Sequence, residues 1–420
     1  MRRIIFFIIC LFFLLLSGCL RPDESPSPFD VLAKEFESQA AIPDEPVIGP
    51  AFEIIPDTVL VYGQSTAGFS VKSVLSNDSI LLNYSEEVEE DILTGAEILE
   101  KISRDYSVNP RLLLALIEYS SGWVTGDGSG SSTEYPINPA DQTRKGLFRQ
   151  LSWTANELNR GFYSSRVGGL ESFSLADGVE VIVSPEINDA TASLQYVLGQ
   201  MMGYHDWQSA VGSLGLYTQY LKLFGNPEDN AYRQIEFEDL AQPEFSLPFS
   251  SSDGWFFTSG PHSAWGDGAA WAALDFAPDE EKYGCYQSDA WVLAAADGLI
   301  VRSIDGAVVQ DLNGDGHEGS GWTILYMHIA ELGRVEEGVH LQAGERIGHP
   351  SCEGGPSNGT HLHLARRFNG EWIPADQDLP FTLSGWVSAG VGVEYDGSLS
   401  RDGQVIYSSG FPTDENKIYH

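Results

Sequence analysis

The feature that most constrains the fold is a short run in which two histidines alternate with two leucines, His361-Leu362-His363-Leu364. Successive side chains of a β-strand point to opposite faces of a sheet, so both leucines can enter a core while both histidines face the other side. Neutral imidazole nitrogens are good ligands for divalent metals. The run therefore predicts a strand that is buried on one face and carries a candidate metal site on the other.

Two other segments carry matching side chains. The segment Gly260-Pro261-His262 is followed, after twelve further residues, by Asp275, and His328 ends the apolar stretch that begins at Leu325. A single histidine on an apolar stretch is more often a core residue than a ligand, but several such segments in one region favour a shared site. The candidates for this site are His262, Asp275, His328, His361 and His363.

Together with Cys352-Glu353-Gly354-Gly355, these segments resemble the lysostaphin and LytM group of zinc endopeptidases. That group usually has three residues between its first histidine and the aspartate. The staphylolytic LasA branch has a longer loop, as this chain does, and is the closer resemblance. The resemblance implies a zinc ion on His262, Asp275 and His363, with His361 and His328 left for the chemistry.

The resemblance also implies a reaction. Three protein ligands leave a position for water, whose pKa zinc lowers toward about 7, so that hydroxide can attack a peptide carbonyl. Either His361 or His328 takes the proton and the other steadies the oxyanion. Asp267, between the ligands, is a candidate for substrate contact or simple solvation.

The expected function is a zinc-dependent endopeptidase that hydrolyses stem or cross-bridge peptides of peptidoglycan. The alternative is a non-enzymatic lipoprotein that binds the cell wall or activates a hydrolase, with two degenerate hydrolase folds. The intact set of histidines favours the enzyme.

The N-terminus has the shape of a secretion signal, because Met1-Arg2-Arg3 precedes an apolar run from Ile4 to Leu16. This run is shorter than the roughly 20 residues that a membrane-spanning helix needs. The following Leu16-Ser17-Gly18-Cys19 resembles the lipobox of bacterial lipoproteins. The resemblance implies removal of residues 1–18, lipidation of Cys19 and an extracytoplasmic, membrane-anchored protein; an ordinary signal peptide is the alternative.

Composition limits the partners and the cysteine chemistry. The net charge of −37 is spread over both halves of the chain, so phosphate would repel it and nucleic acid is an improbable partner. Peptidoglycan and a membrane lipid anchor remain the expected partners. In an oxidising compartment, Cys285 and Cys352 are expected to form a disulfide rather than a metal pair.

Residues 51–235 have helical periodicity, after a Pro-rich and acid-rich tether over residues 19–50. Thr94 with Glu97 forms a capping-box pattern that predicts a helix, and Asn109-Pro110 opens a second helix that Gly122 can end. Further helices are expected around Trp153–Leu158, Ala190–Met202 and Tyr217–Phe224.

Part of this region resembles the lysozyme-like fold of lytic transglycosylases, through Asn109–Ile117, Ser121-Gly122-Trp123 and residues 146–155. That family has its catalytic glutamate directly before the Ser-Gly pair, where this chain has Ser120. Glu118 lies two positions earlier, about 200° around a helix axis, and cannot replace it. We therefore expect an inactive glycan-binding relative, with a purely structural domain or an active glycosidase as alternatives.

The sequence thus predicts an α+β multidomain protein, with an N-terminal α-helical lysozyme-like domain before a mostly antiparallel β peptidase domain. The peptidase domain is expected over residues 236–385, with strands within residues 291–295, 299–301 and 322–326. Residues 386–420 are expected to form a C-terminal β-hairpin extension built from Val391–Tyr395 and Gln404–Tyr407.

A second metal site is conceivable in the acidic run from Asp311 to Glu318. Oxygen ligands at Asp311, Asn313 and Asp315, with glycine next, resemble the start of a calcium loop, and His317 follows directly. The twelfth position is Trp322 instead of glutamate. A turn that binds Ca²⁺ and a simple turn held by Asx hydrogen bonds are both compatible with this pattern.

Overall fold

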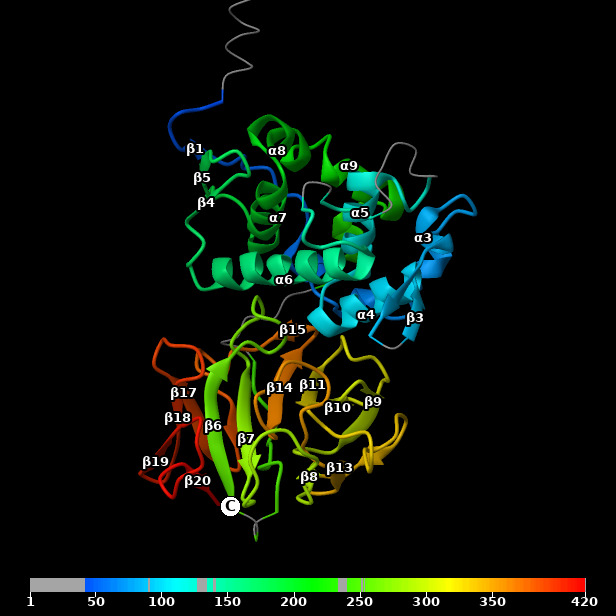
Figure 1. The fold of residues 1–420 in the computed structure, drawn as a ribbon. Helices are drawn as coiled ribbons and strands as arrows, with labels where there is room; N and C mark the ends of the chain where they lie inside the picture. The colour runs from blue at the N-terminus through cyan, green and yellow to red at the C-terminus, as the bar shows by residue number, and fades with distance from the viewer. Residues whose placement is uncertain are drawn as a thin grey trace, which may run out of the picture. The chain divides into compact units, whose positions relative to one another are not determined.

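The structure is a computed structural model that describes residues 42–89, 91–126, 134–138, 141–232, 240–250, 252 and 254–419 (Figure 1). The expected signal segment, the lipidated Cys19 and most of the tether lie outside these residues. Within the described part of the chain, no helix is both long and apolar enough to cross a membrane. The described residues from Asp44 onward form one compact unit.

The N-terminal half is helical, and the helix starts predicted at Thr94 and Asn109 and the helix end predicted at Gly122 are confirmed. The Thr94–Glu97 capping box starts α4 (Gly95–Tyr106), and the Asn109 side chain caps α5 (Pro110–Ser121), which ends at Gly122 with a φ of 67°. The other α-helices among the described residues are α2 (Asp57–Leu60), α3 (Ile80–Asn83), α6 (Leu147–Arg166), α7 (Asp189–Met201), α8 (Tyr204–Val211) and α9 (Leu216–Phe224). Two small sheets, β1 (Val47–Ile48) with β4 (Ser172–Ser174) and β5 (Glu180–Ile182), and β2 (Ser85–Val88) with β3 (Asp91–Thr94), accompany them.

The C-terminal half is built on a nine-stranded antiparallel sheet in the order β12-β9-β10-β11-β14-β7-β6-β20, with β15 paired to β14. This confirms the expected antiparallel β architecture (Figure 1). The strands are β6 (Trp255–His262), β7 (Ala273–Pro278), β9 (Gly298–Ile304), β10 (Ala307–Asp311), β11 (Trp322–Met327), β12 (His340–Leu341), β14 (Leu362–Phe368), β15 (Glu371–Trp372) and β20 (Lys417–Ile418). The short strands β8 (Val292–Leu293) and β13 (Arg346–Gly348) pair separately.

The two faces of this sheet meet different partners. Leu362 and Leu364 are fully buried in a core that belongs to the β half alone. On the opposite face, Ala365 and Ala273 join a second core that continues into the helices. Because His363 lies on the same face as Ala365, the candidate metal site is on the face toward the helices.

Buried charges also join the two halves. Arg302 of β9 donates to Asp105 of α4, and its other terminal nitrogen lies 3.0 Å from Glu318 Oε2. Arg367 of β14 donates to the same oxygen at 2.8 Å, and all four side chains are almost completely buried. Asp105 of helix α4 therefore neutralises part of the buried positive charge of the β half.

The C-terminal stretch differs from the expected hairpin. The first strand of this stretch is β17 (Trp386–Gly390), and the expected strand at Val391–Tyr395 is not formed. The sheet continues through β18 (Gly397–Arg401) to β19 (Gln404–Tyr407) and also includes β16 (Thr382–Leu383), so it has four strands. The expected strand at Gln404–Tyr407 is thus confirmed as β19, whereas the one expected at Val391–Tyr395 is wrong, because β17 ends before Val391.

Candidate metal centre

Three neighbouring strands bring the predicted ligands together. Asp275 of β7 lies directly opposite His363 of β14 in the sheet register, and His262 is the last residue of β6. The β6–β7 pairing is irregular between Ser259 and His262, so the end of β6 leaves the regular ladder. All three ligand side chains are buried.

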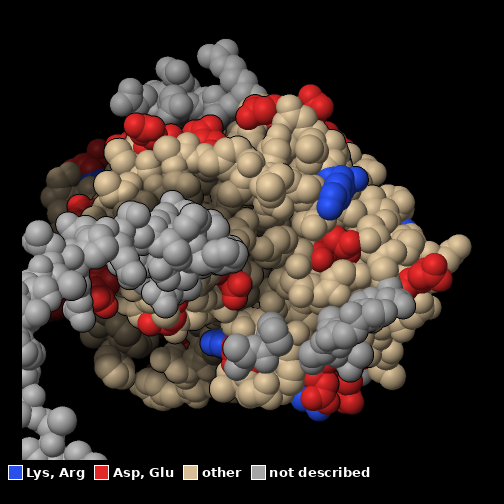
Figure 2. Space-filling view, turned by 90° about the horizontal axis from the view of Figure 1, so that it is seen from above, with Lys and Arg blue, Asp and Glu red and all other residues tan. Residues whose placement is uncertain are grey.

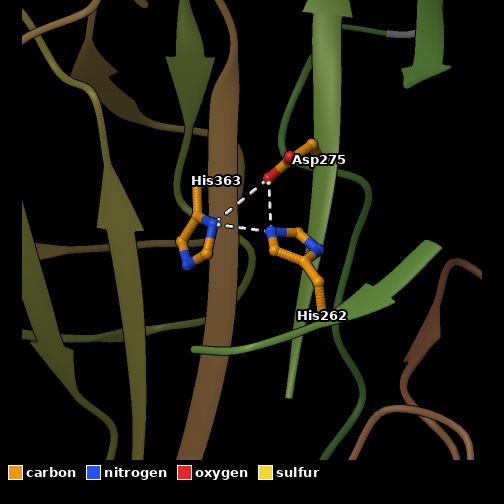
Figure 3. A group of neighbouring side chains, drawn as sticks. All are labelled: His262, Asp275 and His363. Atoms are coloured by element: carbon orange, nitrogen blue, oxygen red, sulfur yellow. Dashed lines mark hydrogen bonds and ion pairs between the residues drawn. The ribbon is translucent and has the colours of Figure 1, made fainter. Parts of the chain in front are cut away.

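Their potential ligand atoms converge on one point (Figure 3). His262 Nε2 lies 3.0 Å from His363 Nδ1. Asp275 Oδ1 lies 3.2 Å from each of these two nitrogens. Two nitrogens and one carboxylate oxygen form a donor set suited to zinc.

The hydrogen bonds on the far sides of the rings assign the protons. His262 Nδ1 lies 2.8 Å from the carbonyl of Gly260, and His363 Nε2 lies 3.1 Å from the carbonyl of Ala264. A carbonyl only accepts, so each of these nitrogens carries a proton, and in a neutral ring the converging nitrogen then carries the lone pair. Among the described residues, no donor satisfies Asp275 Oδ1. Three buried acceptors thus face one another, an arrangement that requires a cation or a bound proton between them.

The pKa directions of the three side chains follow from burial and from their mutual charges. Burial acts to raise the pKa of Asp275, but the His262 and His361 rings hold it well below its usual range. Burial acts to lower the pKa of His262, yet the Asp275 carboxylate raises it overall. Burial lowers the pKa of His363. Asp275 is therefore ionised at neutral pH, as a metal ligand must be.

The other two histidines lie beside this group. His361 Nδ1 donates to Gly359 O and His328 Nδ1 donates to Glu353 O, each at 2.8 Å. Each ring thus keeps Nε2 as a proton acceptor, and the ring centroids are 4.4 Å apart. His361 Nε2 lies 3.7 Å from Asp275 Oδ2.

Backbone strain and burial distinguish His328. Its φ is 66°, an uncommon value for a residue other than glycine that is typical of functional sites. Burial and the nearby His361 and His363 rings lower its pKa to about 3. His328 is therefore neutral at neutral pH.

The predicted disulfide is confirmed and lies next to these histidines. Cys285 and Cys352 are bonded, with their Cα atoms 5.6 Å apart. The adjacent Ser351 donates its backbone N–H to His328 O and forms a bridge with His361. The disulfide therefore anchors the segment that aligns the two histidines.

Several contributors to the site carry no sequence signal. The carbonyls of Gly260 and Ala264 are backbone groups, which side-chain motifs do not reveal. The Tyr395 ring stacks on His262 with centroids 4.8 Å apart, from a segment whose role the sequence did not disclose. Asp267, a candidate for substrate contact or solvation, has an exposed side chain that also accepts hydrogen bonds from Asn156 and Arg160 of α6.

The acidic loop after β10 closes through Asx hydrogen bonds. Asp311 accepts from the N–H groups of Asn313 and Gly316, and Asp315 accepts from that of His317. The His317 ring lies 3.1 Å from Thr66 Oγ1 in the helical half. Binding of calcium by this loop stays a prediction.

Comparison with known proteins follows the same division of the chain. Residues 283–374 match the family model "Peptidase family M23", and residues 53–237 match "LasA, N-terminal domain". Protease LasA of Pseudomonas aeruginosa is 25% identical over 337 residues, which cover 76% of this chain and 74% of that protein. The chain therefore carries a LasA N-terminal domain followed by a peptidase family M23 domain.

Solved structures include further M23 proteins. The M23 metalloprotease pseudoalterin is 23% identical, and the match covers 43% of this chain and all of that one, with a TM-score of 0.35. The catalytic domain of lysostaphin from Staphylococcus simulans is 23% identical over 30% of this chain and 94% of its own, with a TM-score of 0.22. The M23 match includes His328, His361 and His363, whereas His262 and Asp275 lie before it. The lysozyme-like nature of the helical domain stays a prediction.

Proposed function

We propose that the protein is a zinc-dependent endopeptidase that hydrolyses peptide bonds of peptidoglycan stem or cross-bridge peptides. The observation that carries the proposal is the set of three buried acceptors contributed by His262, Asp275 and His363. The M23 domain and the likeness to protease LasA support a peptidase that acts on peptidoglycan.

The donor set fits zinc, because two imidazole nitrogens and one carboxylate oxygen make a three-ligand site of the kind found in metallopeptidases. A zinc ion held there would polarise the scissile carbonyl and make a water molecule acidic enough to attack it near neutral pH. The carbonyls of Gly260 and Ala264 fix the two imidazole rings so that their lone pairs keep pointing to this position.

His361 is the residue we assign to proton transfer. Its Nδ1–H is held by Gly359 O, so Nε2 can take a proton from the attacking water and pass it to the leaving amine. His328 keeps a neutral ring whose Nε2 accepts hydrogen bonds, and its bond to Glu353 O fixes that orientation. The two rings are held by equivalent hydrogen bonds, but burial and the neighbouring rings lower the pKa of His328 to about 3, so His328 is the weaker proton acceptor. This difference supports unequal roles for two histidines that the sequence left interchangeable.

The acidic character of the protein has a consequence for how substrate is bound. Acidic side chains are spread over the face seen in Figure 2 instead of gathering in one patch. Nonspecific attraction to anionic wall polymers or lipid is therefore weak. Retention near the wall would instead depend on the lipid on Cys19, which we propose anchors the protein outside the cytoplasm.

The proposal is tested with purified protein and intact peptidoglycan. The wild-type protein, its chelator-treated form and the form given back zinc are compared, and mass spectrometry identifies the released peptides. We expect cleavage to stop on chelation and return with zinc. His363→Ala should lose both zinc and cleavage, while His361→Ala should keep zinc and lose cleavage. Zinc-loaded wild-type protein that releases no peptide from walls of several cross-bridge types would instead favour the binding lipoprotein.

A further inference from the structure

The loop that joins two of the candidate ligands also orients the third. Residues 263–272 connect His262 to the strand of Asp275, and within this loop the carbonyl of Ala264 accepts the Nε2–H of His363 at 3.1 Å. The N–H of Ala264 in turn donates to Ala270 O at 3.0 Å, which closes the loop on itself. The position of this loop therefore sets the direction of the His363 lone pair.

Helix α6 of the LasA N-terminal domain holds the loop at its tip. Asn156 Oδ1 accepts the backbone N–H groups of Asp267 at 3.1 Å and Gly268 at 3.0 Å. Asn156 Nδ2 donates to Asp267 Oδ1 at 2.7 Å, and Arg160 donates to the same oxygen at 2.8 Å. One amide side chain thus makes three hydrogen bonds to two consecutive loop residues.

The loop fits the helix closely enough to require glycine at two positions. A Cβ atom on Gly268 would lie 2.1 Å from the backbone oxygen of Asn156, and one on Gly266 would lie 2.5 Å from Asn156 Oδ1. Gly266 also has a φ of 63°, which favours glycine by itself. The neighbouring Trp265 ring meets Tyr106 of α4 edge to face, with centroids 6.5 Å apart. The loop is therefore shaped to fit the helical domain.

We propose that Asn156 is a positioning residue of the metal centre, which fixes the 263–272 loop and through it the Ala264 carbonyl that orients His363. The proposal rests on the metal-dependent function proposed above. It adds that the LasA N-terminal domain helps to hold the metal ligands in position. Hydrogen-bonded partners outside the ligand shell typically contribute tenfold or more to metal affinity. Asn156 acts one step further out, so we expect an effect at the lower end of that range.

The test compares Asn156→Ala with a matched control in the purified full chain. Gln64→Ala is the control, because Gln64 Nε2 donates to Asn369 Oδ1 at 3.0 Å and so also bridges the two halves, away from the loop. Zinc affinity is measured by chelator competition, and the visible spectrum of the Co²⁺-substituted protein reports ligand geometry. We expect Asn156→Ala to weaken zinc binding about tenfold and change the cobalt spectrum, and Gln64→Ala to change neither.

Two further variants separate positioning from loss of folding. Gly268→Ala leaves Asn156 in place but should displace the loop, so its zinc affinity should fall as well. The double variant Asn156→Asp with Asp267→Asn restores an acceptor on the helix and a donor on the loop, so it should recover part of the affinity. Folding is followed by circular dichroism in each case.

The outcomes are distinct for the two proposals. Equal zinc affinity and cobalt spectra in wild type and Asn156→Ala would overturn the positioning role while leaving the endopeptidase intact. Faster peptide cleavage by Asn156→Ala at unchanged affinity would overturn it in favour of a restraining helix. A wild-type protein that binds zinc without cleaving any wall would overturn the proposed function. Even then, weaker zinc binding by Asn156→Ala would support the positioning role of Asn156.

Discussion

Two carboxylates, one in each half of the molecule, show how differently the same group can be used. Glu118 of α5 accepts the backbone N–H groups of Val124 at 3.0 Å and Thr125 at 3.1 Å, and also the Thr125 hydroxyl. Asp275 of β7 faces two imidazole lone pairs and has no donor on Oδ1 among the described residues. Glu118 closes the α5 end with its hydrogen bonds, whereas Asp275 Oδ1 lies buried beside two imidazole nitrogens. The comparison separates a carboxylate that closes a turn from one that we propose binds a metal ion.

The largest expected effect comes from removing the charge on Asp275. Asp275→Asn places an amide between His262 and His363 and leaves an uncharged site. Zinc affinity should therefore fall by more than about 100-fold, which is more than the loss of a residue that only hydrogen-bonds to a ligand typically causes. Peptidoglycan cleavage should be lost with it. Zinc analysis after dialysis against metal-free buffer checks this. Full zinc occupancy in the variant would mean that the Asp275 carboxylate, like that of Glu118, does not bind the metal.

The next effect isolates proton transfer from metal binding. His361→Ala removes the proposed acceptor but no ligand, so zinc content should stay at wild-type level while the turnover rate falls by about 10²- to 10⁴-fold. His328→Ala should cost less than His361→Ala in turnover. Steady-state cleavage of a wall peptide with parallel zinc analysis makes the measurement, and equal losses in both variants would contradict the unequal roles.

A third carboxylate, Glu371 of β15, is shared by both halves and predicts a pH effect on stability. Arg166 Nη2 of α6 donates to its two oxygens at 2.7 and 2.9 Å. Burial nevertheless raises the pKa of Glu371 to about 7, so between pH 4.5 and 7 the folded state holds a proton that the unfolded state releases. This contribution to stability is therefore complete at low pH and decreases as the pH rises through that range.

We expect the unfolding free energy of wild type, relative to Glu371→Gln, to fall by up to about 3 kcal/mol between pH 4 and pH 8. Urea denaturation at a series of pH values measures both proteins. If the difference between them were constant with pH, Glu371 would ionise normally despite its burial.

The smallest effect belongs to Glu118. Glu118→Gln replaces a charged acceptor of two backbone N–H groups by a neutral one, which should lower the unfolding free energy by about 1 kcal/mol. Zinc content and peptide cleavage should not change. A loss of cleavage in this variant with normal stability would mean that the helical domain retains chemistry of its own.

Patterns of side chains were sufficient to predict much of this arrangement. The alternation around Leu362 and Leu364 predicted which face of β14 enters the core of the β half, because that period is a property of any strand. It did not predict that the opposite face, with Ala365, is buried as well, in the core shared with the helices. The caps at Thr94 and Asn109 predicted two helix starts, because capping depends on neighbouring residues. The cysteine pair and the grouping of the ligand side chains also followed from the sequence.

Features that depend on tertiary contacts could not be predicted in this way. Every residue has a backbone carbonyl of the same chemistry, so only the fold shows that the carbonyl of Ala264 holds the His363 ring. Asn156 lies 111 residues from Asp267, and no local pattern relates them. The stacking of Tyr395 on His262 likewise depends on where the C-terminal sheet packs.

The most direct test of the metal centre is X-ray absorption at the zinc edge on protein reconstituted with one equivalent of zinc. The account predicts a tetrahedral ion with two imidazole nitrogens and light oxygen ligands at about 2.0–2.2 Å, and a changed spectrum in Asp275→Asn. Sulfur ligands, or an identical spectrum in wild type and Asp275→Asn, would contradict the assignment of zinc to His262, Asp275 and His363.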